Sequence, residues 1–393
     1  MSLEGFVPHK EGRTTLLVPE LSLGKGPPEL FPAFFNPRGK VVRDISVIAV
    51  EAFSRTTSSS AVFADPLAGV GGRSLRIAVE CPSVSAVKAN DLNPIAIQAA
   101  SRAAHMNGCE GKVELSGVDA NLFLARLSSP QGRPHIIDVD PFGTPAPFVE
   151  SSLRAIVDGG MLAVTATDTA VLSGLHPEVA RRKYGAQALR TDYSRESMLR
   201  MLLGLVAHRA LVYDMVIDPL LCHADQHYAR VYCRVRISPT EANASLDRIG
   251  YLLHCFKCGH RESVDHTKET CPLCGGRLKA SGPLWVGDLY EKAFLDSMCE
   301  ASASLEMKKY DSLFARAREE IGFPPFYFKI PYFTDQLGVA SLSPSDLVER
   351  LTAAGFRAVR SSVDGQGVKT TANVEEVVAA LSSSHPMKPR HTK

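Results

Sequence analysis

The chain has 393 residues, of which 45% are hydrophobic and 22% charged, a composition typical of a globular protein with two or three domains. Lysine and arginine number 44 and aspartate and glutamate 42, so the net charge of +2 excludes a basic field over the whole surface, and any nucleic-acid contact must come from a local basic patch. No apolar run is long enough to cross a membrane, and residues 1–10 lack the apolar segment of a signal peptide, so we expect a cytoplasmic protein without a membrane partner.

Cysteine usage points to one metal site in a reduced compartment. The single cysteines are Cys81, Cys109, Cys222, Cys233 and Cys299. The other four of the nine form two C-x-x-C pairs. Scattered single thiols do not make a disulfide framework, whereas two closely spaced pairs are the pattern of a metal site.

The N-terminal region predicts an arm followed by a helix. The alternating run 13–18 lies among Pro- and Gly-rich residues and indicates a short hairpin laid over the next domain. Residues 45–53 have helical apolar spacing, and Arg43 stands at the start of that helix, where a cation gains nothing from the helix dipole. Arg43 is therefore either a solvated surface residue or a bidentate ligand for a carboxylate.

From residue 61 onward, strands and helices alternate at even spacing. The predicted strands are 61–65, 84–89, 112–116, 135–139 and 161–165, and the predicted helices are 72–81, 94–107, 120–127, 145–157 and 197–213. This alternation predicts an α/β fold with a doubly wound parallel sheet. Two further strands, 215–222 and 227–237, are separated so briefly that they should pair as an antiparallel hairpin. A parallel sheet closed by such a reversal is typical of the S-adenosylmethionine-dependent methyltransferases.

Acidic residues follow successive strands of this sheet. The first strand runs into the glycine-rich loop 65–73, Asp91 follows the second strand and Asp119 the third. Ligands of such sheets bind beyond the carboxyl ends of the strands, where Asp91 can hold ribose hydroxyls and Asp119 an adenine amino group. Each acid taken alone is more often a turn residue or an N-cap than a cofactor ligand. Together they indicate a cofactor that contains a nucleoside.

The fourth strand ends in the most informative stretch of the chain. Asp140, Pro141 and Phe142 follow the buried run 135–139, and Pro141 cannot continue a strand ladder. The carboxylate can accept one N–H of an amine on a flat ring, the carbonyl of Pro141 another, and Phe142 can stack on the ring. The alternative interpretation is a strand followed by an acidic turn.

The nature of the cofactor follows from its charges. NAD carries a pyrophosphate, whereas S-adenosylmethionine carries an amino-acid end and a positive sulfur. Arg43 and Arg73 could bind the carboxylate of S-adenosylmethionine, and Asp140 offers an anion near its positive sulfur. Methyl transfer therefore fits better than hydride transfer.

These motifs resemble those of the tRNA (guanine-26-N2)-dimethyltransferases over nearly the whole chain. The shared residues are Glu11-Gly12, Phe34-Phe35-Asn36-Pro37, Arg43-Asp44, Asn90-Asp91, Asp140-Pro141-Phe142-Gly143, Thr165-Ala166-Thr167-Asp168, His176-Pro177, Arg182-Lys183-Tyr184, His227-Tyr228 with Arg230, Gly282-Pro283-Leu284-Trp285 and Val368-Lys369-Thr370. The chain departs from the family where Gly39, Val42 and Gln226 stand.

The resemblance implies roles for particular residues. S-adenosyl-L-methionine would be held by Arg43, Arg73, Asp91, Asp119 and Ala120. Asp140 would be the catalytic carboxylate, and Phe142 would align the base, which must leave its stack to reach the crevice.

The second half of the chain carries the metal motif. Cys255, Cys258, Cys271 and Cys274 form C-x2-C-x12-C-x2-C, which fills the tetrahedral shell of a structural Zn²⁺ and leaves no open position. His254, His260 and His266 are expected to be exposed loop residues and not ligands.

Residues beyond the metal motif predict a small α+β unit. A helix is expected over 289–318, an irregular aromatic core segment over 323–333, and a second helix over 343–354. A hairpin follows, whose Arg357, Arg360 and Lys369 could meet phosphates, and the basic tail 382–393 is expected to be disordered.

The sequence thus predicts a class I S-adenosylmethionine-dependent methyltransferase, with a Rossmann-like, doubly wound sheet that ends in an antiparallel hairpin. Residues 1–240 would form the arm and catalytic domain, and residues 241–393 a smaller tRNA-binding domain with a zinc ribbon-like module at about 250–280. The expected activity is dimethylation of N2 of guanine 26 in tRNA, without an obligate protein partner. The alternatives are an amino-methyltransferase acting on adenine or on a protein amide, and a non-catalytic RNA-binding zinc protein.

Overall fold

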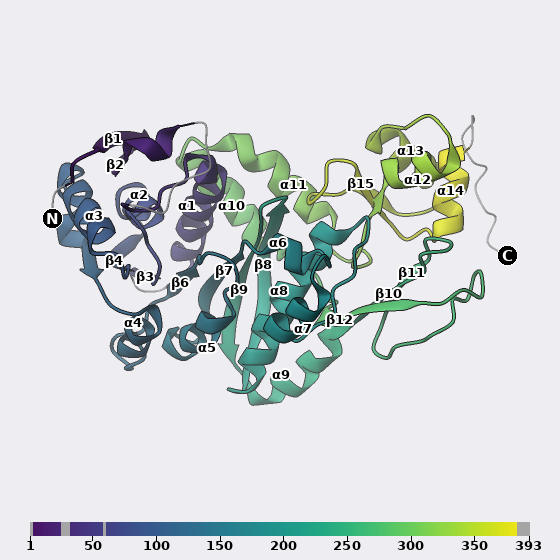
Figure 1. Cartoon of the computed structure of the whole chain (residues 1–393), viewed down its shortest axis with the longest axis horizontal. Coiled ribbons are helices and arrows are strands. Elements are labelled where there is room, and N and C mark those ends of the chain that lie inside the picture. The colour runs from purple at the N-terminus through teal and green to yellow at the C-terminus, as the bar shows by residue number, and fades with distance from the viewer. Residues whose placement is uncertain (1–2, 25–31, 58–59, 383–393) are drawn as a thin grey trace.

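The computed structural model describes residues 3–24, 32–57 and 60–382, and its centre is a seven-stranded sheet (Figure 1). The strands are β3 (Ala61–Asp65), β4 (Val84–Asn90), β5 (Val113–Ser116), β6 (Ile136–Val139), β7 (Gly160–Ala166), β8 (Met215–Asp225) and β9 (Tyr228–Ile237). Their order is β5-β4-β3-β6-β7-β9-β8. Strands β3 to β7 are parallel, and β9 runs antiparallel to both β7 and β8, so the predicted terminal hairpin is confirmed.

Helices cover both faces of this sheet. They are α1 (Lys40–Ser54), α2 (Gly72–Glu80), α3 (Pro94–Met106), α4 (Ala120–Leu127), α5 (Ala146–Ala155), α6 (Thr169–Leu172), α7 (Pro177–Tyr184) and α8 (Ser194–Leu211). Helix α2 contacts both α1 and α3, and α5 contacts α4 and α8. The chain first moves from β3 outward to β5 and then returns to β6, so the order of strands reverses between β3 and β6. In an open α/β sheet this reversal creates the ligand crevice at the carboxyl ends of the two strands.

The N-terminal arm lies against the first helices. Strands β1 (Phe6–Glu11) and β2 (Thr14–Pro19) form the predicted antiparallel hairpin, and β2 packs on α2 and α3. The short 3-10 helices Glu20–Leu23 and Pro37–Gly39 complete the arm. This packing places Glu11, at the end of β1, among the charged residues of α1 and α2.

The second half adds two small sheets and several helices. Its strands are β10 (Ile249–His254), β11 (Arg261–Val264), β12 (Lys279–Trp285), β13 (Phe328–Lys329), β14 (Ala358–Arg360) and β15 (Gly367–Thr370). Its helices are α9 (Pro239–Ala244), α10 (Lys292–Ser304), α11 (Asp311–Glu319), α12 (Ile330–Leu337), α13 (Pro344–Ala353) and α14 (Val374–Ser382). Short 3-10 helices span Ser245–Arg248 and Lys308–Tyr310 in this half, and Glu110–Lys112 before β5 in the first half. The sheets are β11-β10-β12 and β13-β15-β14, and both are antiparallel.

Buried charges join the second half to the catalytic sheet. Lys369 of β15 is 2% exposed, and its Nζ lies 2.7 Å from Oε1 of Glu196 in α8 and 3.4 Å from Oε2 of Glu320. Nη1 of Arg261, in β11, donates to Oδ2 of Asp192 at 3.0 Å, and Asp192 lies two residues before α8 begins. The suggestion that Lys369 meets phosphates is therefore wrong, because its charge is already neutralised inside the protein.

Four further expectations for the second half have different outcomes. The helix expected over 289–318 is broken into α10 and α11, with Glu306 at a φ of +59° between them. His254 is buried against Tyr193 and Phe256 instead of exposed, because it is the last residue of β10. The aromatic segment 323–333 packs in the core as expected, but it is not irregular throughout, because β13 and the start of α12 lie within it. Of the basic tail, residues 383–393 lie outside the described part of the chain.

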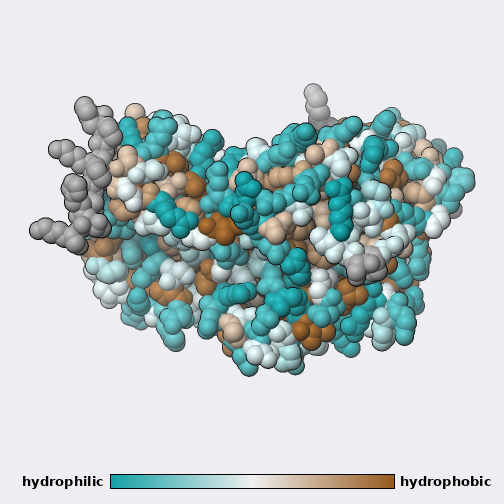
Figure 2. All heavy atoms as spheres, turned by 180° about the vertical axis from the view of Figure 1, so that it is seen from behind, coloured by the Kyte–Doolittle hydropathy of each residue, from teal (hydrophilic) through white to brown (hydrophobic). Residues whose placement is uncertain are grey.

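The face shown in Figure 2 is mostly hydrophilic, with hydrophobic residues scattered over it, and it is hollowed at its upper edge. Among the described residues, no helix is long and apolar enough to cross a membrane.

Candidate active site and zinc cluster

A buried row of alternating charges ends at Asp140. Oδ2 of Asp140 accepts from Arg73 at 2.5 Å, and Nη1 of Arg73 donates to Oδ1 of Asp138 at 2.9 Å. The other oxygen of Asp138 accepts from Arg230, which is fully buried. Asp138 is buried on β6, whereas the side chain of Asp140, two residues further, is 30% exposed. The row therefore leads from the core of the sheet to a carboxylate at the surface.

This surrounding fixes the charge of Asp140. Burial acts to raise its pKa, but the positive charges of Arg73 and Arg230 outweigh burial and lower the pKa below its ordinary value. Asp140 is thus a carboxylate at neutral pH. The pKa of Asp65 shifts in the opposite direction. This residue is buried at the end of β3, and its burial raises the pKa to about 7.

Phe142 is held at the rim. Phe142 is 63% exposed, and its ring forms a T-shaped pair with that of Phe34, with a centroid distance of 4.5 Å and an interplanar angle of 87°. Two hydrogen bonds fix the following residue: Gly143 N donates to Oγ1 of Thr167 at 2.7 Å, and Thr167 N donates to the carbonyl of Gly143 at 2.8 Å. At the end of β6 an exposed ring therefore follows a partly exposed carboxylate by two residues.

The acids after β4 and β5 lie at the same edge of the sheet. Both oxygens of Asp91 accept backbone amides, from Gly69 and from Asn93, each at 2.8 Å. Asp91 therefore joins the glycine-rich loop to the end of β4, and it remains half-buried. Asp119 is exposed and caps α4 by accepting from Asn121 at 2.9 Å and from Leu122 at 3.1 Å, while Ala120 is buried.

Arg43 already grips a carboxylate within the chain. Its Nε and Nη2 donate to the two oxygens of Glu11, at 2.8 and 2.6 Å. Nη2 also donates to the carbonyl of Asn36, and the guanidinium lies 4.9 Å from the centre of the Phe35 ring. A Cβ added at Gly39 would lie 2.9 Å from Nη1 of Arg43, so the glycine found there leaves room for this arginine. Glu11 thus orients Arg43.

The crevice fits a nucleoside cofactor with an amino-acid end. The carboxylates of Asp91 and Asp119 offer hydrogen-bond acceptors at the ends of β4 and β5, and Asp91 is bonded to the amide of Gly69 in the glycine-rich loop. Arg73 keeps one buried nitrogen, Nε, without a hydrogen-bond partner among the described residues.

Several residues of the site were not assigned a role from the sequence. Glu11, Phe34 and Arg230 appeared only as parts of shared motifs, and Asp138 as a strand residue. The buried run 135–139 contained one signal for Asp138, since a carboxylate inside an apolar strand requires a buried cation as partner. Its partners lie 65 and 92 residues away in the chain, so their identity required the fold.

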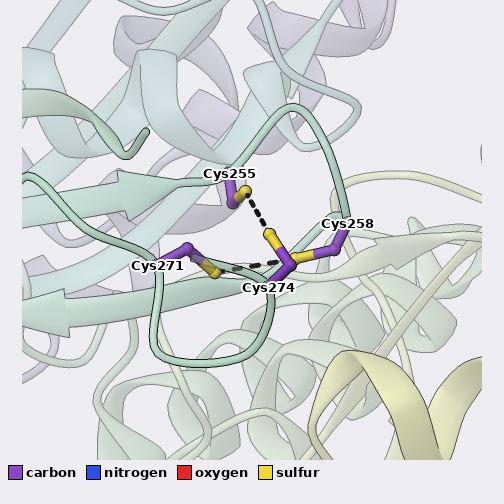
Figure 3. Close-up of side chains that lie close together, drawn as sticks. All are labelled: Cys255, Cys258, Cys271 and Cys274. Atoms are coloured by element: carbon purple, nitrogen blue, oxygen red, sulfur yellow. Dashed lines mark hydrogen bonds between the residues drawn. The ribbon is translucent and has the colours of Figure 1, made fainter. Parts of the chain in front are cut away.

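The four predicted metal ligands converge (Figure 3). Sγ of Cys255 lies 3.5 Å from that of Cys274, Sγ of Cys258 lies 3.6 Å from that of Cys271, and all four are within 4.8 Å of one another. Two sulfurs on a tetrahedral Zn²⁺ with bonds of about 2.3 Å are about 3.8 Å apart, so the cluster fits the ion.

Each cysteine pair is closed by a glycine in the left-handed region. Gly259 and Gly275 have φ values of +77° and +66°, and their amides donate to the carbonyls of Cys255 and Cys271. His260 and His266 are not members of the cluster. His266 is exposed as expected, whereas the side chain of His260 is only 13% exposed, so the expectation that it is exposed is wrong.

The comparisons with known proteins agree with this geometry. The family described as N2,N2-dimethylguanosine tRNA methyltransferase matches residues 12–382. The tRNA (guanine(26)-N(2))-dimethyltransferase of Methanothermobacter thermautotrophicus is 36% identical over 382 residues, which are 96% of this chain and 98% of that protein. The tRNA (guanine(26)-N(2)/guanine(27)-N(2))-dimethyltransferase of Aquifex aeolicus is 32% identical, with 95% of each chain covered.

A solved structure extends the likeness to the fold. The complex of Trm1 from Pyrococcus horikoshii with S-adenosyl-L-methionine is 27% identical, has a TM-score of 0.83, and is matched over 95% of this chain and 99% of that chain. The likeness therefore covers the catalytic sheet and the second half together. The chain belongs to the family of N2,N2-dimethylguanosine tRNA methyltransferases.

Proposed function

We propose that this protein transfers two methyl groups in succession from S-adenosyl-L-methionine to N2 of guanine 26 in tRNA. The observation that carries the proposal is the pairing of Asp140 and Phe142: an ionised, partly exposed carboxylate stands two residues before an exposed ring at the carboxyl end of β6. Membership of the family and the names of the relatives support the choice of substrate and position.

Asp140 would act on the amine of the guanine. The lone pair of that nitrogen is delocalised into the ring, which makes it a poor nucleophile. By accepting one N–H, the carboxylate favours a pyramidal nitrogen and stabilises the positive charge that develops on it during transfer. The methylated nitrogen is then strongly acidic, so Asp140 can take its proton even with a lowered pKa. The nitrogen–carbon bond forms as the sulfur–carbon bond breaks.

Phe142 and Phe34 would align the base. A guanine in a stacked helix does not expose N2 to an enzyme crevice, so the base must swing out of the tRNA. The exposed ring of Phe142 offers a surface for stacking, and its perpendicular contact with Phe34 would fix its orientation. One N–H remains after the first transfer, so the same carboxylate can direct the second.

The cofactor would be held at the neighbouring strand ends. S-adenosyl-L-methionine supplies an electrophilic methyl group on a positively charged sulfur. Asp91 offers acceptors for ribose hydroxyls, Asp119 and Ala120 the surroundings of the adenine, and Arg43 a cation for the carboxylate. Arg73 uses one N–H of Nη1 and one of Nη2 on Asp138 and Asp140, so it would reach the cofactor through its remaining N–H groups, among them the unpartnered Nε.

Residues 241–393 would form the tRNA-binding domain, and Zn²⁺ would be structural. All four cysteines are needed to complete the tetrahedral shell, so the ion has no open position for catalysis. Its contribution would be to fix the two loops of residues 255–258 and 271–274.

Nucleoside analysis tests the proposal directly. The protein is incubated with labelled S-adenosyl-L-methionine and unmodified tRNA, and with a tRNA in which guanine 26 is replaced by adenine. We expect labelled N2-methylguanosine first and N2,N2-dimethylguanosine later, from the first tRNA alone. Labelled adenosine, label in protein, or equal label in both tRNAs would contradict the proposal.

A further inference from the structure

Helix α7 carries a shared motif, Arg182-Lys183-Tyr184, that catalysis does not use. The hydroxyl of Tyr184 donates to Oδ1 of Asp168, and Nζ of Lys183 lies 3.5 Å from Oδ2 of the same residue. Tyr184 is 2% exposed, so this contact is part of the core. The last turn of α7 is therefore fixed to Asp168 by two side chains.

Asp168 in turn belongs to the rim of the active site. It follows Thr167, which makes two hydrogen bonds with Gly143, the residue after Phe142. A continuous series of contacts thus leads from the exposed ring to the end of α7. The helix cannot shift without moving the loop that carries Phe142.

The same turn presents two cations to solvent. Arg181 and Arg182 are both exposed, and neither forms an ion pair within the part of the chain that the structure describes. Glu178, one turn earlier and also exposed, does not pair with them there. Arg181 lies one turn before Tyr184 on the same flank of the helix, and Arg182 lies opposite the buried Ala180.

The phosphates on either side of an extruded nucleotide need cations at the rim of the pocket that holds the base. A flipped guanine stays bonded to the phosphates on its two sides, which must pass over the rim of the pocket that holds the base. Arginine binds phosphate bidentately, and such contacts fix the register of a nucleic acid without reading its sequence. A net charge of only +2 means that local cations must do this.

We propose that Arg181 and Arg182 bind the tRNA backbone beside the extruded guanine. This rests on the proposed function, because it assumes a tRNA substrate. The alternative is a role confined to α7, since cations in a last turn also stabilise the helix dipole. The two roles differ in what they predict for tRNA binding and for its salt dependence.

The test is the double variant Arg181→Ala/Arg182→Ala in the full-length protein, with Arg181→Lys/Arg182→Lys beside it. The KM for tRNA should rise roughly tenfold in the alanine variant and less in the lysine variant. The slope of log affinity against log salt should become shallower by about 1.4 to 1.8, the value for two phosphate contacts. The KM for S-adenosyl-L-methionine and the melting temperature should stay close to those of the wild type.

The matched control is Arg154→Ala/Arg209→Ala. Arg154 and Arg209 are exposed arginines in the last turns of α5 and α8. Both helices end at the opposite edge of the sheet, just before β7 and β8 begin. This variant removes the same charge, so it reports the effect of net charge alone.

The outcomes separate this inference from the proposed function. If the wild-type protein methylates tRNA but the two alanine variants have the same KM and the same salt slope, α7 does not bind the backbone. A lower melting temperature with unchanged salt slope would show the helix-stabilising role instead and would also overturn the inference. No methylation of tRNA by the wild-type protein would contradict the proposed function itself.

Discussion

Nη2 of Arg73 lies 2.5 Å from Oδ2 of Asp140, while Nη1 of the same guanidinium donates to the buried Asp138 at 2.9 Å. One arginine thus links a carboxylate of the core to a carboxylate of the rim. It lowers the pKa of Asp140 against the effect of burial, which acts to raise it. The charge state of Asp140, the proposed catalytic group, therefore depends on a side chain of α2.

The pH profile should reveal this dependence. Replacing Arg73 by Met removes the positive charge, so the pKa of Asp140 rises and the carboxylate is lost at a higher pH. The acidic limb of kcat, measured at saturating cofactor and tRNA, should move up by about one to three pH units. Arg73→Lys keeps the charge and should shift the limb less. An unchanged limb in Arg73→Met would show that Asp140 does not carry the essential ionisation.

Asp140→Asn tests the carboxylate itself. The amide keeps the shape of the side chain and can still accept from Arg73, but it lacks the negative charge that stabilises the developing cation. The single-turnover methylation rate should fall roughly 10²- to 10⁴-fold, while calorimetry shows little change in cofactor affinity. Asp247→Asn, a substitution at an exposed acid outside the site, is the control and should leave both values unchanged. Near-normal turnover in Asp140→Asn would refute the assigned role.

Phe142→Leu tests the stacking surface. The ring is 63% exposed, so its loss should hardly change the melting temperature. Loss of a stacked base costs about 1–3 kcal/mol, which corresponds to a fall of roughly 5- to 150-fold in kcat/KM for tRNA. Phe256→Leu removes another exposed ring, 52% exposed, from the loop of the first cysteine pair. Equal single-turnover rates for these two variants would argue against a role of Phe142 in orientation.

Removal of the metal should affect stability before chemistry. We expect one zinc ion per chain by elemental analysis, and loss of that ion in Cys258→Ser. Four buried or half-buried thiols lose their common ligand in that case, so the melting temperature should fall. The affinity for S-adenosyl-L-methionine should persist, because its proposed ligands lie on the first half of the chain. Cys299→Ser, at a single cysteine outside the cluster, is the control. A metal-free wild-type protein with normal stability would contradict a structural role.

Asp65 should make the protein less stable as the pH rises. Its pKa is about 7 in the folded state, against about 4 when unfolded, so between these values the folded state holds a proton that the unfolded state has released. The unfolding free energy therefore falls from pH 4 to pH 7, by up to about 4 kcal/mol for this group. Asp65→Asn should remove this part of the decline in denaturant titrations. Parallel pH curves for Asp65→Asn and wild type would show that Asp65 does not titrate in this range.

The local sequence pattern was sufficient to predict the strands and helices of the seven-stranded sheet. Strand 61–65 and helix 120–127 have the predicted bounds, because apolar periodicity, glycine and helix caps act within a few residues. The zinc ligands were also predictable, since a C-x2-C pair places two thiols on one tight loop. Asp140 and Phe142 could be placed at the crevice because they directly follow a buried strand.

The sequence by itself therefore determined the order of the elements along the chain, the antiparallel hairpin that ends the sheet, the cysteine cluster and the position of Asp140. Only the tertiary structure decided which charges pair: Arg43 with Glu11, Arg73 with two acids, and Lys369 with a buried Glu196 instead of a phosphate. The physical reason is that these partners are 32 to 173 residues apart in the chain. Attraction between opposite charges depends on their distance in space, and a local sequence pattern contains no record of that distance.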